Sequence, residues 1–199
     1  MKITKDFYQH KDVVFLAQKM LGKLLCTNIQ GVFTIGKIVE TEAYCGASDK
    51  ACHAHLNRRT KRTEIMFGEG GKAYVYLCYG IHSLFNIVTN TTGKADAILV
   101  RAIEPVEGIT YMLKRRGMQK MEYRLTAGPG VMSKAMGIET SHYGTELNGD
   151  LIWLEDNGED IDDEKVIASP RVGIDYAEED ALLPWRFRIA ENKWCSKAK

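Results

Sequence analysis

Ile38-Val39-Glu40-Thr41-Glu42-Ala43-Tyr44 is the stretch from which the fold is worked out. Its β-branched first half and its alternation of apolar and polar residues predict a β-strand. Successive side chains of a strand point to opposite faces, so Glu40, Glu42 and Tyr44 share one face and the intervening residues share the other. At the strand rise, the two carboxylates lie about 7 Å apart.

Two carboxylates this close repel each other, and enclosing the face that carries them raises at least one pKa. Such a pair would suit acid–base chemistry. The alternative interpretation is an edge strand whose acidic face is solvated, which needs no function at all. The quoted stretch alone leaves both interpretations open.

The segments before this strand predict a helix followed by a hairpin. Apolar residues at three- and four-residue spacing predict an amphipathic helix from Asp12 to Leu24, with Asp12 as its N-cap. The segments 26–29 and 32–37 predict two strands joined by a turn at Gln30-Gly31, and the second strand continues into the quoted stretch.

Length and composition predict one globular domain that spans residues 1–199. The chain has 45% hydrophobic and 27% charged residues, as soluble proteins have. It has no apolar run near the roughly 20 residues of a membrane span and no signal segment, so we expect no membrane association and a cytoplasmic location. The five scattered cysteines predict free thiols. Cys52, His53 and His55 lack the second ligand pair of a zinc site, so we expect no metal.

The charges are segregated, although the net charge is only +1. Acidic residues are concentrated between Glu155 and Glu164. This pattern predicts one cationic face and an anionic face away from it. The main basic run consists of Arg58, Arg59, Lys61 and Arg62.

Residues 73–88 predict a second hairpin, with a tight turn at Tyr79-Gly80. Tyr74 and Tyr76 fall on one face, and Tyr79 stands at the tip. The tyrosines could simply be core residues with polar handles, but an aromatic side chain at a turn is hard to bury. Asn86 interrupts an apolar strand and needs hydrogen-bond partners from the backbone or from a ligand.

Arg101 interrupts the apolar strand predicted over residues 97–103. A buried arginine requires an anionic partner. Glu104 is the nearest in sequence, and Glu40 or Glu42 on a neighbouring strand is the alternative that we favour.

The remaining elements are predicted from local signals. Gly128 precedes a helix start whose free N–H groups suit a phosphate oxygen. In the last strand, Trp185, Phe187 and Ile189 are expected to face inward, opposite two arginines. The elements are a helix from Pro105 to Arg116 closed by Gly117, a helix from Val131 to Met136, and strands at 151–154, 171–174 and 185–189.

Taken in order, these segments resemble the alkyladenine (3-methyladenine) DNA glycosylase family over nearly the whole chain. The resemblance implies an α+β fold: a single mixed domain with a curved, mainly antiparallel β-sheet, surrounding helices and a protruding β-hairpin. It is carried by Val39–Tyr44, His53, Met66-Phe67 with its glycines, Tyr74–Asn86, Arg101–Pro105, Gly128-Pro129, Arg171–Ile174 and Arg186-Phe187. The chain departs from the family at Cys45–Ser48, where a Gly-Pro pair is common.

The family resemblance also implies an activity. Its members flip alkylated or deaminated purines out of duplex DNA, which costs a few kcal/mol, and hydrolyse the N-glycosidic bond to leave an abasic site. They use water and no metal or cofactor, and they do not cleave the strand. We expect a monomer that acts on double-stranded DNA, at the nucleoid in a prokaryote or in the nucleus in a eukaryote.

Matching positions imply the roles of single residues. Glu42 corresponds to the general base that activates water, and Arg101 to the residue that orients it. Tyr79 corresponds to the residue that intercalates into the gap left by the flipped base. The base pocket consists of Tyr44, Tyr76, His53 and Asn86, the last of which discriminates against the guanine 2-amino group. The basic run and Gly128 are the expected contacts of the DNA backbone.

Two other functions remain open from the residues. A carbohydrate glycosidase could use Glu40 and Glu42 as acid and nucleophile, since retaining enzymes place two carboxyl groups about 5–5.5 Å apart. A non-catalytic protein that binds damaged DNA would need the hairpin and the basic run but neither carboxylate.

Overall fold

The structure is a computed structural model that describes residues 1–197, and it confirms the predicted α+β fold. Eight antiparallel strands form one open sheet with the order β3-β4-β5-β2-β1-β6, while β8 pairs with β2 and with β7. The strands are β1 (Leu24–Ile29), β2 (Val32–Tyr44), β3 (Ala73–Cys78), β4 (His82–Thr89), β5 (Asp96–Glu107), β6 (Ile152–Glu155), β7 (Val166–Ser169) and β8 (Arg186–Ile189).

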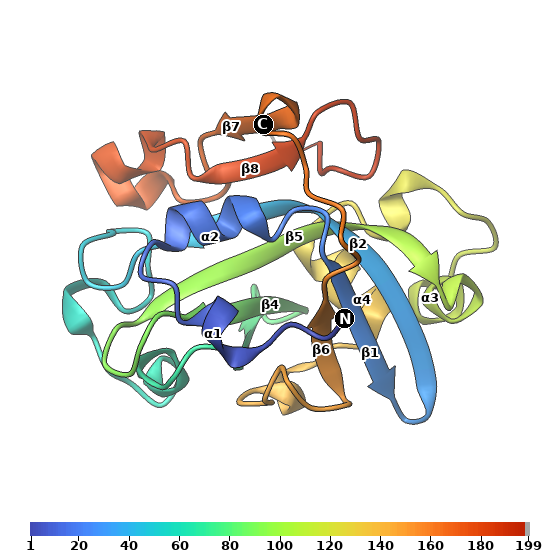
Figure 1. The fold of residues 1–199 in the computed structure, drawn as a ribbon, viewed down its shortest axis with the longest axis horizontal. Helices are drawn as coiled ribbons and strands as arrows, with labels where there is room; N and C mark the ends of the chain where they lie inside the picture. The colour runs from blue at the N-terminus through green and yellow to red at the C-terminus, as the bar shows by residue number, and fades with distance from the viewer. Residues whose placement is uncertain (198–199) are drawn as a thin grey trace.

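Helices surround this sheet, and α2 lies beside the two long strands β2 and β5 (Figure 1). In the described part of the chain, no helix has both the length and the apolar character to span a membrane. The α-helices are α1 (Lys5–Tyr8), α2 (Val13–Lys19), α3 (Ile109–Arg116) and α4 (Pro129–Met136). The 3-10 helices are η1 (His55–Asn57), η2 (Glu64–Phe67), η3 (Tyr123–Leu125), η4 (Thr140–His142), η5 (Asp163–Lys165) and η6 (Asp175–Leu182).

Strand β2 is central to the sheet rather than at its edge. Its first half pairs with β1, and residues Glu40–Glu42 pair with β8, while β5 runs along the other side. Thr41 faces α2, where its hydroxyl donates to the Ala17 carbonyl at 2.8 Å. Both carboxylates, Glu40 and Glu42, are completely buried. The interpretation of a solvated acidic face is therefore wrong.

Both predicted hairpins are confirmed. Gln30 and Gly31, and likewise Tyr79 and Gly80, all have positive φ, as the two-residue turns that match strand twist require. The hairpin of β3 and β4 leaves Tyr79 87% exposed at its tip.

The first helix is shorter than predicted. Asp12 caps α2 as expected, because its side chain accepts the Val14 and Phe15 N–H groups at 2.9 Å. The helix ends at Lys19, since Gly22 turns the chain with a φ of +86° and Leu24 already belongs to β1.

The helix predicted from Pro105 begins too early. Strand β5 continues through Pro105, which lies opposite Gly36 at a register shift. Proline is tolerated at such an irregularity because it donates no ladder hydrogen bond. Helix α3 begins only after Gly108, and Gly117 closes it as predicted.

The C-terminal part of the chain also differs from the prediction. Residues 171–174 form a bend rather than a strand, and the strand β7 was not expected. In β8, Phe187 is buried as predicted, but Arg186 on the opposite face is only 3% exposed. Arg186 is buried because it meets the carboxylate of Glu40.

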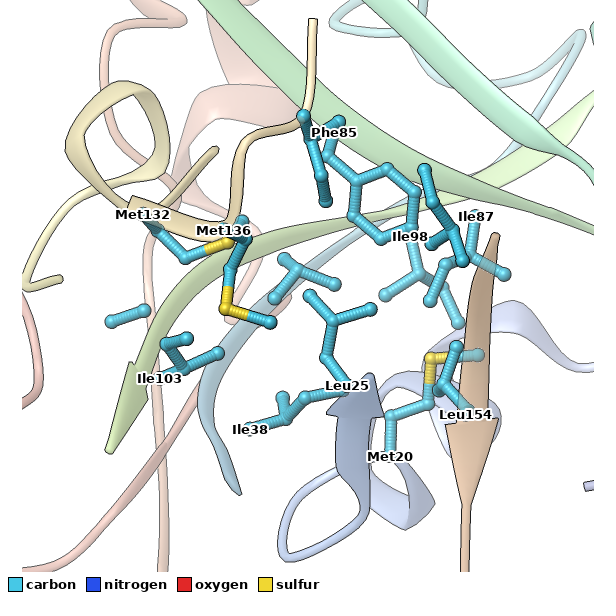
Figure 2. Packing of buried hydrophobic residues seen from close by; sticks show 14 of the residues in the cluster. Met20, Leu25, Ile38, Phe85, Ile87, Ile98, Ile103, Met132, Met136 and Leu154 are labelled. Atoms are coloured by element: carbon cyan, nitrogen blue, oxygen red, sulfur yellow. The ribbon is translucent and has the colours of Figure 1, made fainter. Parts of the chain in front are cut away.

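The main core joins the sheet to α2 and α4. Figure 2 shows Met132 and Met136 of α4 pointing toward Leu25 and Ile103, while Met20 lies near Leu154 at the other end. All of these side chains are completely buried. This core holds β2 and β5 rigidly beneath the residues described next.

We predict that Gly70→Ala destabilises the fold by about 1–3 kcal/mol, as overpacking of an interior does. An added Cβ would lie 2.5 Å from the Tyr8 carbonyl oxygen and 2.9 Å from that of Asn90, and neither backbone can give way easily. Urea unfolding measures the effect. Gly149→Ala is the control, because its Cβ would meet nothing nearer than 3.5 Å. Equal stabilities of the two variants would contradict this packing.

Candidate active site

A cavity of about 440 Å³ opens between the β3–β4 hairpin, strands β2 and β5, and the segments around residues 51–53 and 172–176. Its volume lies within the range of small-molecule sites. The fold brings seven of the predicted site residues to its wall: Tyr44, His53, Arg62, Tyr76, Tyr79, Asn86 and Arg101.

Glu42 lies directly behind this wall. Its carboxylate accepts the Tyr44 hydroxyl at 2.8 Å and the Val172 N–H at 2.8 Å, and it forms an ion pair with Arg101 at 3.1 Å. All three partner residues, Tyr44, Val172 and Arg101, line the cavity, while Glu42 does not. The carboxylate is thus one side chain away from a bound molecule.

Arg101 lies between both carboxylates, as favoured from the sequence. Its Nε donates to Glu40 at 2.9 Å, and its Nη1 meets Glu42. The alternative partner Glu104 instead accepts from the Asn192 side chain at 3.0 Å.

The register of β2 and β5 places Arg101 beside the carboxylates. The pairs Ile38 with Ile103 and Thr41 with Val100 belong to one register, which sets Arg101 opposite Glu40. Directly opposite residues of paired strands share a face of the sheet, so Arg101 lies on the face that carries Glu40 and Glu42. Two compensating irregularities, which pair Glu40 with Ala102, leave this register unchanged on both sides.

Glu40 is held by four donors. They are Arg101 Nε, Arg186 Nε at 2.7 Å, and the Ser196 N–H and hydroxyl at 2.5 and 2.8 Å. Burial raises the pKa of Glu40, but Arg101, the Ser196 amide and Arg186 together hold it below its ordinary value. The increase expected for at least one of the two carboxyl groups is therefore not found at Glu40, because two guanidinium groups outweigh the neighbouring charge.

Aromatic rings cover one side of the cavity. The Tyr74 and Tyr76 rings lie 5.4 Å apart, and His53 meets Tyr76 edge-on at 4.7 Å. His53 Nδ1 is 2.7 Å from the Tyr74 hydroxyl. Burial, with smaller contributions from Arg62 and Arg58, lowers the pKa of His53 to about 4, so the ring is neutral at pH 7.

Asn86 finds its partners in the backbone. Its amide nitrogen donates to the carbonyls of Tyr74 at 3.1 Å and Leu84 at 3.3 Å, which fixes the side chain at the cavity wall. The backbone, rather than a ligand, therefore supplies the hydrogen-bond acceptors of the Asn86 amide nitrogen.

The basic run is not uniform. Arg62 lines the cavity, and its guanidinium lies 5.5 Å from the centre of the Tyr76 ring. Arg59 is engaged by Glu64 through two hydrogen bonds. Arg58 and Lys61 are exposed. Gly128 caps α4, and the following Pro129 reaches the cavity.

The sequence did not reveal the role of Arg171, which holds Tyr44 and Val172 in place. The guanidinium of Arg171 lies 4.8 Å from the Tyr44 ring centre and 5.1 Å from that of Trp185, and both of its terminal nitrogens bond to Asp49. Arg171 thereby places the neighbouring Val172 N–H against Glu42. No local signal reveals this pair, because Asp49 and Arg171 are 122 residues apart.

We predict that His53 makes the stability of the fold fall as the pH decreases from about 6.5 to 4. Its unfolded pKa is 6.5 and its folded pKa is about 4, so the unfolded state binds the proton first. The loss is on the order of 3 kcal/mol. Urea unfolding between pH 7 and 4 measures it, and the variant His53→Gln lacks this contribution. Parallel curves for the two proteins would contradict the prediction.

The chain is similar to a known protein family along most of its length. Residues 6–193 match the family model described as methylpurine-DNA glycosylase. A protein of Clostridium tetani is 42% identical and aligns with 99% of this chain and 100% of its own length. A protein of Chlorobaculum tepidum is 43% identical, with 100% and 92% covered. Both carry the name "Putative 3-methyladenine DNA glycosylase".

The matched region includes every residue that surrounds the cavity, and each relative aligns along almost its whole length. The chain belongs to the methylpurine-DNA glycosylase family.

Proposed function

We propose that this protein is a DNA repair glycosylase that flips alkylated or deaminated purines, 3-methyladenine among them, out of duplex DNA and hydrolyses their N-glycosidic bond. The observation that carries the proposal is the Glu42–Arg101 pair directly behind an aromatic cavity. Family membership and the names of the relatives support the same activity.

The cavity suits a flipped purine. Its volume of about 440 Å³ accommodates one base, and the rings of Tyr44 and Tyr76 offer surfaces for stacking. Stacking is worth about 1–3 kcal/mol per base, which offsets the cost of extrusion. A cationic alkylated purine is additionally attracted to electron-rich ring faces.

His53 presents a donor to the edge of that base. The Tyr74 hydroxyl donates to His53 Nδ1 in the arrangement that we assign, so the neutral ring carries its proton on Nε2. Asn86, fixed by two backbone carbonyls, limits the space beside the base and would exclude the 2-amino group of guanine.

The partners of the two carboxylates distinguish them. Glu42 is held by Tyr44, Val172 and Arg101, all of which line the cavity, whereas of the partners of Glu40 only Arg101 lines it. An ionised carboxylate has about four acceptor sites, two on each oxygen, and Oε2 of Glu42 accepts only the Tyr44 hydroxyl. Glu42 therefore keeps a site for one water, which it would activate for attack on the sugar while Arg101 orients it.

This difference argues against the glycosidase alternative. A general acid must carry a proton, but the pKa of Glu40 is lowered by Arg101 and its other donors despite burial. Glu40 also does not line the cavity. Glu40 is thus poorly suited to act as the general acid of a glycosidase.

DNA binding would use the same face of the molecule. Tyr79 at the hairpin tip would fill the gap in the base stack, and Arg58, Lys61 and Arg62 would neutralise phosphates. Arg59 would contribute after releasing Glu64, and the Gly128 turn would offer backbone N–H groups. We further propose that the protein acts as a monomer with water alone, and in the cytoplasm at the nucleoid, since the relatives named above are bacterial.

We expect Glu42→Gln to slow single-turnover base release by about 10²–10⁴-fold, because a general base contributes that much. The assay uses duplexes that carry 3-methyladenine, 7-methylguanine, hypoxanthine or ethenoadenine. Binding of the lesion duplex should change little, which separates loss of chemistry from loss of the site. Near-normal release by the variant would refute the role of Glu42, and absence of release by the wild-type protein would favour a non-catalytic binder.

We expect Tyr79→Ala to weaken binding of a lesion duplex about tenfold or more, since one base–aromatic stack is worth about 1–3 kcal/mol. Fluorescence anisotropy at fixed salt concentration measures the affinity. The control is Tyr111→Ala on α3, which removes a tyrosine that is 49% exposed and does not line the cavity. Equal affinities of the two variants would eliminate the intercalation proposal.

A further inference from the structure

The segment before the end of the described chain is folded into the sheet behind the active site. Trp194 is 3% exposed, Ser196 is 7% exposed, and the Cys195 thiol donates to the Val39 carbonyl. Residues 194–196 are thus attached to the sheet. The residue that ties this segment down is Glu40.

Ser196 makes two hydrogen bonds to Glu40, the carboxylate that Arg101 and Arg186 share. Its backbone N–H donates to Glu40 Oε2 at 2.5 Å, and its hydroxyl donates to Glu40 Oε1 at 2.8 Å. The same hydroxyl lies 3.5 Å from Arg101 Nη2 and 3.4 Å from Arg186 Nη2. Ser196 thus lies at the point where both guanidinium groups meet one carboxylate.

Every nitrogen of Arg101 therefore has its own contact. Nε donates to Glu40, Nη1 meets Glu42, and Nη2 meets the Ser196 hydroxyl. A planar guanidinium held at three points cannot rotate or tilt. Among these groups, Arg101 is the one that reaches the cavity wall in the described chain.

We propose that Glu40, Arg186 and Ser196 are positioning residues that fix the Arg101 guanidinium against Glu42, so that a C-terminal segment behind the sheet sets the rate of base excision. The proposal rests on the proposed function and goes beyond it, because it assigns a role to three groups that do not touch a substrate.

Geometry explains why the contacts that hold the Arg101 guanidinium would control the rate of base release. Misplacing a catalytic group by about 1 Å can cost about 10²-fold. Removing the Glu40 carboxylate removes the anionic acceptor of Arg101 Nε and of Arg186 Nε, and leaves Glu42 as the carboxylate paired with Arg101. Arg101 would then move to share Glu42 differently.

A structural role alone would have a different signature. It would lower the stability of the fold but leave the folded fraction fully active. The variants Ser196→Ala, Glu40→Gln and the double variant Glu40→Gln/Arg186→Met separate the two roles, because the double variant removes one positive charge along with the negative charge but still lacks the anionic acceptor for Arg101.

The control is Ser169→Ala. Ser169 lies opposite Arg186 in the β7–β8 pairing, and its hydroxyl has no hydrogen-bond partner in the described structure. This substitution removes a serine hydroxyl, as Ser196→Ala does, but it leaves the contacts of Arg101 with Glu40, Glu42 and Ser196 unchanged. Melting temperature, affinity for a hypoxanthine duplex and the single-turnover release rate are measured for each full-length variant well below its melting temperature.

We expect Ser196→Ala to slow release several-fold and Glu40→Gln by about 10–100-fold, with affinities within about threefold of the wild-type protein. The double variant should recover melting temperature relative to Glu40→Gln yet remain as slow. Ser169→Ala should match the wild-type rate. The proposal is overturned if Glu40→Gln or Ser196→Ala releases base at the wild-type rate, or if rate and stability recover together in the double variant. Absence of release by the wild-type protein would instead overturn the proposed function.

Discussion

The sharing of Arg101 between Glu40 and Glu42 is the interaction on which the rest of the structure depends. Burying two carboxylates is costly unless each is paired and hydrogen-bonded. Here two arginines balance two glutamates, and the C-terminal segment supplies the remaining donors through Ser196. Because the charge cluster cannot be dismantled without leaving an unpaired ion, strands β2, β5 and β8 must stay in one arrangement.

The same interaction gives the two carboxylates different surroundings, although they look equivalent in the sequence. Glu40 is held by Arg101, Arg186 and Ser196, whereas every partner residue of Glu42 lines the cavity. The Arg171–Asp49 pair acts in parallel from the other side, since it holds the Tyr44 ring and brings the Val172 amide to Glu42. Cavity wall and carboxylate are thus positioned by the same buried cations.

Much of the fold could be predicted because its signals are local. The turn residues Gln30-Gly31 and Tyr79-Gly80, the Asp12 cap and the Gly117 helix end act over a few residues, and all are confirmed. Pro105 misled the prediction because proline starts helices and is also tolerated at a strand irregularity, and only the pairing with β2 decides between them. The bend at 171–174 forms because its groups bind Asp49 and Glu42 rather than another strand.

By itself, the sequence determined that Glu40, Glu42 and Tyr44 share a face, that Tyr79 is exposed, and that Arg101 needs a carboxylate. These conclusions follow from strand periodicity, turn geometry and the cost of burying a charge. Only the tertiary structure decided which partners each carboxylate has. The partners of Glu40 include Arg186 and Ser196, which lie about 150 residues away along the chain. Contacts over such distances follow from chain packing, and no local pattern encodes them.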